Sequence, residues 1–240
     1  MKLAKRVLFA TSIAVTIVLA GVTTAQQKGR GRGGFGGLGG PTPAVVLAAN
    51  EAVQKDLGLS GDKASKLTSL RDDYFAASQK EYQAAGINFQ DFQNLSNEER
   101  QKRGEKVAEI GTKLNSEFGP KLKEVVSADQ YKRLQQIQLQ YGLRNLGPAA
   151  LTAPDVASEL KLTDDQKQKL NDLNAEYGRK QRELFTGGGF DQEAFGKLRD
   201  ERSSKALDVL TAEQKEKLNS LKGPAFDVTQ IGFGGRRGKN

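Results

Sequence analysis

The chain has 240 residues and a formal net charge of +8, with 28% charged and 37% hydrophobic residues. It contains no cysteine, histidine or tryptophan, which excludes a disulfide framework, lipid attachment through a cysteine, and metal sites built on cysteine or histidine. Only 7% of the residues are aromatic, so the sequence predicts thin cores between amphipathic helices, in an elongated chain or a homodimer.

Residues 1–25 have the pattern of a secretory signal peptide. Lys2, Lys5 and Arg6 precede an apolar stretch over residues 7–22, and small residues follow up to Ala25. Cleavage after Ala25 fits this pattern, and cleavage after Ala20 is an alternative. An uncleaved membrane anchor is the competing interpretation, although the stretch is short for a span. No second apolar run follows, so we expect a periplasmic or secreted protein without a further membrane span.

Two glycine-rich segments, residues 26–42 and 227–240, are predicted to be disordered tails, because glycine loses the most backbone entropy on ordering. The signal peptide contributes a charge of +3, residues 26–32 contribute +3 and residues 227–240 contribute +2, which leaves residues 33–226 without net charge. The tails are therefore the candidate polyanion contacts, as in the Arg-Gly-Gly segments of RNA-binding proteins. Their basic residues are Lys28, Arg30, Arg32, Arg236, Arg237 and Lys239. A flexible spacer is the favoured interpretation, and nucleic acid is the least favoured partner.

One helix-start phrase occurs four times along the body of the chain. A hydroxyl residue can accept a hydrogen bond from the backbone N–H three residues on, and a glutamine there can accept one from the N–H of the capping residue. The four copies are Leu59-Ser60-x-x-Lys63, Val126-Ser127-x-x-Gln130, Leu162-Thr163-x-x-Gln166 and Leu210-Thr211-x-x-Gln214. These residues are predicted to be structural capping motifs.

The body also repeats itself. At an offset of 103 residues Leu67 falls on Leu170 and Tyr74 on Tyr177, and at an offset of 84 Leu134 falls on Leu218. Internal duplication of a helical pattern predicts two similar, stacked units. We place helical unit one at residues 43–148 and helical unit two at residues 149–226.

Within each unit the apolar residues recur with the period of an α-helix, and no segment alternates with period two. The phrase Leu-x-x-Leu-x-x-x-Tyr predicts the core positions, and Gly119-Pro120 predicts a kink or break in the helix that follows Ser96. The predicted stripes are Leu67, Leu70, Tyr74; Val107, Ile110, Leu114, Phe118; Leu134, Ile137, Tyr141; and Leu170, Leu173, Tyr177, Leu184. The predicted fold is all-α, with long antiparallel helices.

The inventory for catalysis is poor. Without histidine or cysteine the chain lacks the usual general base and the thiol nucleophile. Adjacent acidic pairs occur at residues 72–73, 98–99 and 164–165, but neighbouring side chains on a helix point about 100° apart and do not converge on one substrate. The sequence therefore predicts a protein that is not an enzyme and that uses no cofactor and no metal.

The repeated phrase resembles the LTxxQ-motif family of exported periplasmic helical proteins, the Spy/CpxP-like group. Residues 162–166 and 210–214 match the motif outright, residues 126–130 are a conservative variant and residues 59–63 are degenerate. The resemblance spans residues 43–226 and implies an all-helical, often dimeric, cradle-like protein of the envelope stress response, acting as an ATP-independent chaperone or signalling accessory. The chain departs from the family by its tandem duplication and its tails, and two units in one chain could replace the dimer.

Three functional hypotheses remain at this point. The first is an exported binding protein that acts as a chaperone on unfolded protein clients through apolar patches and steering charges. The second is a structural or scaffolding module that binds one partner in the cell envelope. The third, a polyanion or RNA binder, rests on the tails alone.

Overall fold

The computed structural model describes residues 42–88, 91, 95–186 and 191–232. Within these ranges the chain forms ten α-helices and one short 3-10 helix and contains no strand, so the predicted all-α fold is confirmed. The predicted signal peptide, residues 26–41 and residues 233–240 lie outside the described residues, as do all six candidate polyanion contacts. None of the described helices is long and apolar enough to cross a membrane.

The order of helices occurs twice along the described chain. The first five helices are α1 (Ala44–Ala48), α2 (Glu51–Asp56), α3 (Gly61–Ala84), α4 (Asn97–Val125) and α5 (Ala128–Leu146). The next five are α6 (Pro148–Leu151), α7 (Pro154–Glu159), α8 (Asp164–Thr186), α9 (Gln192–Asp208) and α10 (Ala212–Lys222). The 3-10 helix η3 (Val228–Gln230) follows them. An offset of 103 residues places α2 on α7, and an offset of 84 places the start of α5 on the start of α10.

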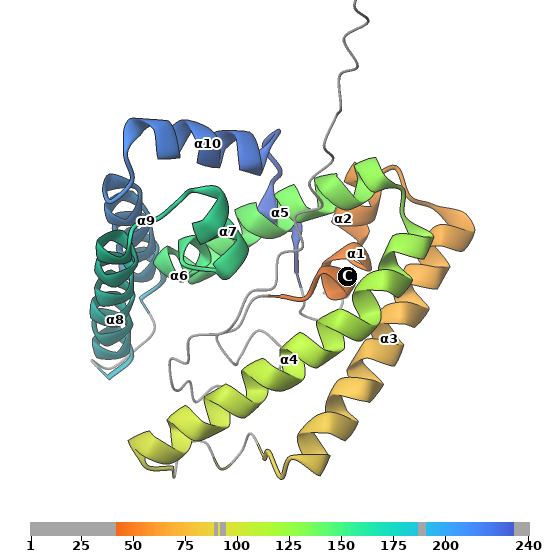
Figure 1. Ribbon diagram of the computed structural model, residues 1–240, viewed down its shortest axis with the longest axis horizontal. Coiled ribbons are helices and arrows are strands. Elements are labelled where there is room, and N and C mark those ends of the chain that lie inside the picture. Colours follow the sequence, from red (N-terminus) through yellow and green to blue (C-terminus); the bar gives the residue numbers. More distant parts are fainter. Residues whose placement is uncertain (1–41, 89–90, 92–94, 187–190, 233–240) are drawn as a thin grey trace, which may run out of the picture.

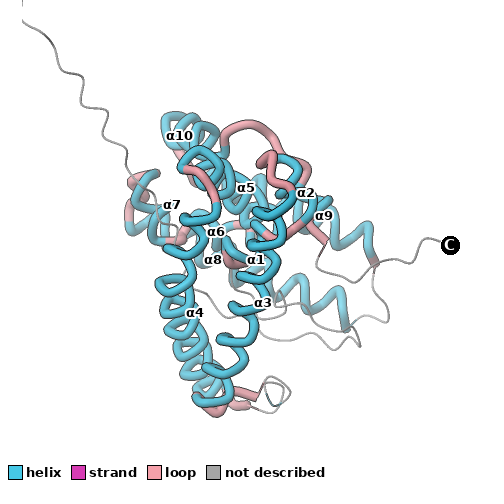
Figure 2. The backbone as a smooth tube through the Cα atoms, turned by 90° about the vertical axis from the view of Figure 1, so that its right-hand side faces the viewer, coloured by secondary structure: helices cyan, strands magenta, loops and turns pink. Residues whose placement is uncertain are grey.

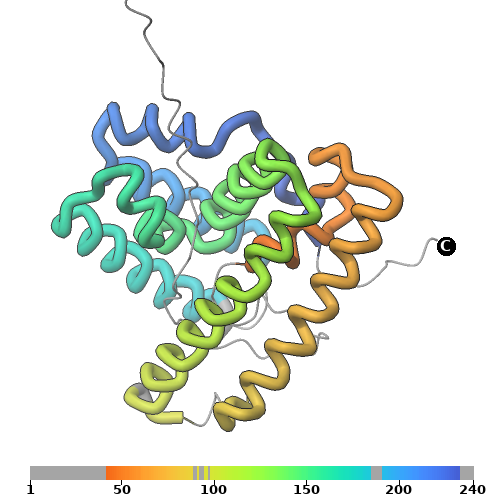
Figure 3. The backbone as a smooth tube through the Cα atoms, turned by 45° about the vertical axis from the view of Figure 1, so that its right-hand side comes forward, coloured from red at the N-terminus to blue at the C-terminus, as the bar shows by residue number. Residues whose placement is uncertain are grey.

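The long helices form two antiparallel hairpins. Figure 1 shows α3 with α4 as one hairpin and α8 with α9 as the other, with α5 running between them and both hairpin tips pointing downward. α3 and α4 lie side by side in the two turned views as well (Figures 2 and 3). α10 lies at the opposite end from the hairpin tips. α5 contacts α9 of the second hairpin, and α1 contacts α3, α4 and α5.

Two hydrophobic clusters fill the space between the helices. The larger cluster is built on α1 to α5, and Leu67, Leu114, Leu134 and Ile137 are at most 1% exposed in it. The smaller cluster is built mainly on α6 to α10, with Leu151, Leu170 and Leu218 equally buried. Burial of such leucines is the main source of stability in helices of this length.

The predicted apolar stripes agree with this burial at most positions. The buried members are Leu67, Leu70, Tyr74, Ile110, Leu114, Phe118, Leu134, Ile137, Leu170 and Tyr177. Val107, Tyr141, Leu173 and Leu184 are half-buried. Leu173 aligns with the buried Leu70, and the smaller second cluster leaves it partly open to solvent.

The predicted unit boundary at residue 148 does not separate two independent cores. Leu139 of α5 is buried in the second cluster, although it lies in the first predicted unit. In the other direction, the first cluster includes Ile231, and Phe226 and Val228 pack against it. Phe226 is the last residue of the second predicted unit, and the other two residues follow it. Residues 227–232, predicted to belong to a disordered tail, therefore include η3 and a buried isoleucine that is only 6% exposed. The apolar side chains of this segment explain the error.

The predicted break at Gly119-Pro120 does not occur either, because α4 continues through Pro120 to Val125. A proline inside a helix removes one backbone hydrogen bond and costs about 3 kcal/mol. Phe118 and Leu122 on either side are 3% and 1% exposed. Their burial offsets that cost and holds the helix together.

Candidate functional site

Three of the four capping motifs form both hydrogen bonds of a capping box. The N–H of Ser127 donates to Oε1 of Gln130 at 3.0 Å, and the N–H of Gln130 donates to Oγ of Ser127 at 3.2 Å. The same pair of bonds joins Thr163 with Gln166 and Thr211 with Gln214. Ser60 is also an N-cap, but its side chain accepts no hydrogen bond. Lys63 stands where the other copies have glutamine, and an ammonium group has no acceptor for the returning bond.

The motif glutamines have a second contact that links distant helices. Nε2 of Gln130 donates to the carbonyl of Leu57 at 2.9 Å, and Nε2 of Gln214 donates to the carbonyl of Leu160 at 3.1 Å. The two contacts are equivalent under the offsets of 84 and 103 residues. The first contact joins the first turn of α5 to Leu57, the C-cap residue of α2. The second joins the first turn of α10 to Leu160, the C-cap residue of α7. The amide is required, because a glutamate at this position would have no donor for the carbonyl.

In the second half of the chain the two outright LTxxQ copies meet each other. Nε2 of Gln166 donates to Oε1 of Gln214 at 2.7 Å, and Nε2 of Gln214 donates to Oε1 of Gln166 at 3.0 Å. Nε2 of Gln166 also donates to the carbonyl of Val209 at 2.9 Å. Both donors and both acceptor positions of each amide are thereby occupied. The motif residues are fully used in holding the helices together, which leaves none of these groups for a ligand.

An ion pair accompanies each of these junctions. Asp56 at the end of α2 receives two bonds from Arg133 of α5, at 2.8 and 3.1 Å. At the equivalent positions Nζ of Lys217 lies 2.8 Å from a carboxylate oxygen of Glu159. The Arg133 and Asp56 side chains are 18% and 27% exposed, whereas the Lys217 side chain is 48% exposed. The first pair is therefore the better shielded from solvent.

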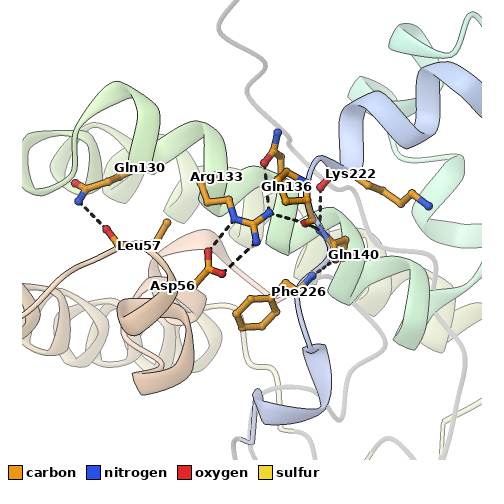
Figure 4. Close-up of polar contacts among 9 residues, drawn as sticks. Asp56, Leu57, Gln130, Arg133, Gln136, Gln140, Lys222 and Phe226 are labelled. Carbon is orange, nitrogen blue, oxygen red and sulfur yellow. Dashed lines mark hydrogen bonds and ion pairs between the residues drawn. The ribbon is translucent and has the colours of Figure 1, made fainter.

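The same face of α5 holds the segment that follows α10, as Figure 4 shows. Nη1 of Arg133 donates to the carbonyl of Pro224 at 2.7 Å. Nε2 of Gln140 donates to the carbonyls of Lys222 and Pro224, and its Oε1 accepts from the N–H of Phe226 at 2.8 Å. These bonds direct the chain from the second cluster back to the first.

A groove opens between α1, α4 and α5, with a volume of about 310 Å³. Its apolar lining includes Val45, Phe118 and Leu122, all of them otherwise buried in the first cluster. Ser116 and Pro120 of α4 line it as well. Pro120 has no N–H to donate to the carbonyl of Ser116, four residues earlier in the helix. The groove therefore has an apolar floor, with Ser116 and Pro120 in its wall.

Polar side chains mark one side of this groove. Gln138 and Tyr131 of α5 line it, and Nε2 of Gln138 donates to the carbonyl of Thr42 at 2.9 Å. Nζ of Lys123 lies 4.9 Å from the centre of the Tyr131 ring. Burial, and after it the charge of Asp155, raises the pKa of Tyr131, so this hydroxyl stays protonated and can donate at neutral pH. Sequence reasoning missed the groove, although a proline within a predicted helix was a signal for it.

The described surface offers little else for chemistry. Leu207 is the one large hydrophobic residue that the described part of the chain leaves exposed, at 38%. Among the same residues there is no group of three or more acidic side chains placed to hold a metal ion. The groove is therefore the main candidate for binding an apolar group.

Comparison with known proteins yields no family model, no curated protein and no solved structure that matches this chain. The case for a function consequently rests on the groove and on the sequence motifs.

Proposed function

We propose that the protein is an exported, periplasmic binding protein that holds apolar side chains of partly unfolded protein clients in the α1–α4–α5 groove. The observation that carries this proposal is the composition of the groove. Val45, Phe118 and Leu122 form an apolar floor, and the polar side chains of Tyr131 and Gln138 line one side of the groove. An apolar residue in an extended chain, with its backbone N–H and carbonyl groups, has both complementary parts. Binding of this kind needs neither catalysis nor a cofactor.

The sequence motifs support the same class of protein. The signal-peptide pattern of residues 1–25 supports export, and the LTxxQ phrase supports a relation to helical periplasmic chaperones. The body from residue 33 to residue 226 has no net charge, so clients of either sign can approach it. The tails act in this proposal as spacers.

The proposal is tested by filling the groove from its rim. Ser116 is an exposed residue of α4 that lines the groove, and Thr112 is an exposed residue one turn earlier that does not. Ser116→Trp should abolish most of the ability to suppress aggregation of a denatured protein, whereas Thr112→Trp should retain it. Light scattering of two unrelated denatured clients measures both. Full activity of the Ser116→Trp protein would overturn the proposal.

A second arm of the experiment tests the tails. Deleting residues 26–40 and 232–240 should leave helical content and anti-aggregation activity nearly intact. If the tails bind a polyanion, this deletion removes that binding, and the affinity of the intact protein falls steeply with salt. Tight binding of RNA or an acidic polymer at physiological salt that vanishes with the tails, without chaperone activity, would favour the polyanion hypothesis.

The second candidate function is a scaffolding module that binds one dedicated partner in the envelope. The scarcity of exposed large apolar side chains among the described residues favours it, because a promiscuous binder usually presents a larger apolar patch. A pull-down from the envelope fraction separates the two. One stoichiometric partner, captured by the wild-type protein and lost with Ser116→Trp, together with no suppression of aggregation, would select the scaffold.

A further inference from the structure

A second cavity, of about 120 Å³, lies where the end of α5 meets α8 and α9. Three arginines line it: Arg144 from α5, and Arg199 and Arg202 from α9. Tyr177, Gln181 and Phe195 are among its other lining residues, and no carboxylate is among them. A small cavity with three cationic side chains and no acidic one has an excess of positive charge.

Arg202 is a partly buried member of this cluster. One of its amino groups, Nη2, donates to the carbonyl of Asn145 at 3.1 Å. Its Nε atom is buried and has no hydrogen-bond partner, and no carboxylate of the described residues forms an ion pair with the guanidinium group. Burial, and after it the charge of Arg199, lowers the pKa of Arg202. A partly buried cation without a counter-ion is unfavourable until an anion pairs with it.

The neighbouring acidic groups are used elsewhere. Arg199 contacts Asp200 at 3.3 Å, but the Asp200 side chain is 75% exposed, so solvent screens the pair. Glu201 accepts a hydrogen bond from the hydroxyl of Tyr177 at 2.7 Å and lies 3.4 Å from Nζ of Lys205. Neither carboxylate lines the cavity. The charge of Arg144 interacts with that of Asp227, which does not line the cavity either. The lining of the cavity therefore holds three cationic side chains and no acidic group to compensate them.

We propose that this arginine pocket, lined by Arg144, Arg199 and Arg202, binds a phosphate group. Guanidinium groups present planar pairs of N–H donors that match the oxygens of phosphate, and such charge-assisted bonds are the stronger kind. The volume suits one phosphate group, so the rest of a larger ligand would lie outside the cavity. Free inorganic phosphate and the phosphate of an anionic lipid headgroup share this chemistry. The pocket is separate from the α1–α4–α5 groove, so the inference does not rest on the proposed function.

The test uses the full mature chain and inorganic phosphate as the probe, with sodium chloride at equal ionic strength as the reference. Phosphate should raise the midpoint of thermal unfolding of the wild-type protein and shift the Nε–H resonance of an arginine in NMR spectra. Arg202→Gln should weaken phosphate binding at least about tenfold, the loss expected from one charge-assisted hydrogen bond. Arg71→Gln, in α3 and outside the lining of the pocket, is the matched control and should bind as the wild type does.

A second measurement distinguishes ligand binding from a merely structural role of Arg202. Without phosphate, Arg202→Gln should unfold at a midpoint no lower than that of the wild type, because the substitution removes a partly buried charge that has no counter-ion and the glutamine amide can still donate to a carbonyl. Arg144→Gln provides an independent variant and should also weaken binding. Equal responses to phosphate and chloride, or unchanged phosphate affinity in both variants, would overturn the proposal.

Vesicles distinguish the source of the phosphate group. Binding to phosphatidylglycerol vesicles that free phosphate competes away and that Arg202→Gln abolishes would assign a lipid headgroup. Binding of free phosphate, with Arg202-independent or absent vesicle binding, would assign a soluble phosphate. Both results support the pocket and differ only in its ligand.

Discussion

The junctions around Gln130 and Gln214 occupy equivalent places in the repeated helix order, yet they are reinforced differently. Both have a glutamine that donates to a carbonyl of the preceding short helix and an ion pair beside it. The junction at Gln130 also has the bond from Arg133 to the carbonyl of Pro224. The junction at Gln214 also has the reciprocal pair of amide bonds between Gln214 and Gln166. The repeated sequence thus specifies the shared bonds. Single differences, such as Lys63 in place of glutamine, determine which additional bonds form.

The largest expected effect tests whether the two cores contribute equally. Leu67 and Leu170 are equivalent and fully buried, so replacing either with alanine should cost about 2 to 5 kcal/mol of unfolding free energy. Urea denaturation followed by circular dichroism measures both. A loss below 1 kcal/mol for Leu170→Ala, or rapid amide exchange along α8 in the wild type, would contradict the packing of the second core.

The ion pairs should differ more clearly than the cores. Arg133→Met leaves Asp56 and the Pro224 carbonyl without their donor and should cost about 1.5 to 3 kcal/mol, the range for bonds to charged groups. Lys217→Met removes a more exposed pair and should cost about 0.2 to 1 kcal/mol. Double-mutant cycles with Asp56→Asn and Glu159→Gln isolate the pair energies. Equal coupling energies would mean that the better shielding of the Arg133–Asp56 pair from solvent adds nothing.

The caps offer a comparison within one motif. Thr163→Ala should cost about 1 kcal/mol, and Thr163→Gly only a few tenths, because a threonine cap accepts a hydrogen bond that alanine cannot accept. Ser60→Ala should change stability by less than about 0.5 kcal/mol, since Ser60 accepts no such bond. Thermal unfolding of the three variants checks this order. A Ser60→Ala loss as large as that of Thr163→Ala would show that Ser60 caps its helix in solution.

The smallest effect is a gain. Lys63→Gln should restore the capping box at α3 and place an amide near Gln130, raising stability by up to about 1 kcal/mol. Lys66→Gln, an exposed lysine of the same helix, makes the same charge change without a capping role. If the two variants are equally stable, the positive φ of 56° at Gly61 keeps the start of α3 away from capping geometry.

Much of the fold was open to prediction because its causes are local. Helical periodicity predicted the buried faces of α3, α4 and α5, and the hydroxyl-to-glutamine spacing predicted the helix starts. The two equivalent ion pairs could also have been predicted from the repeat. An offset of 103 residues places Asp56 on Glu159, and an offset of 84 places Arg133 on Lys217.

The remaining features depend on contacts between residues that are far apart in the chain. The bond from Arg133 to Pro224 joins residues 91 positions apart and ends on a backbone carbonyl, which leaves no pattern in the side chains. The α1–α4–α5 groove and the arginine pocket likewise form only when three helices meet. Sequence periodicity assigns a face to each helix but does not identify the helices that cover it.

The packing of residues 224–231 against the first cluster determines when during synthesis that cluster can finish folding. Ile231 completes a core whose other members begin at Val45, so the first half keeps an open face until residue 231 has been synthesised. Contacts of such long sequence separation form late in folding. A ribosome-bound or translocating intermediate would therefore stay only partly folded. That delay suits a protein that we propose to be exported, because the first cluster gains these stabilising contacts only after residues 224–231 have been synthesised.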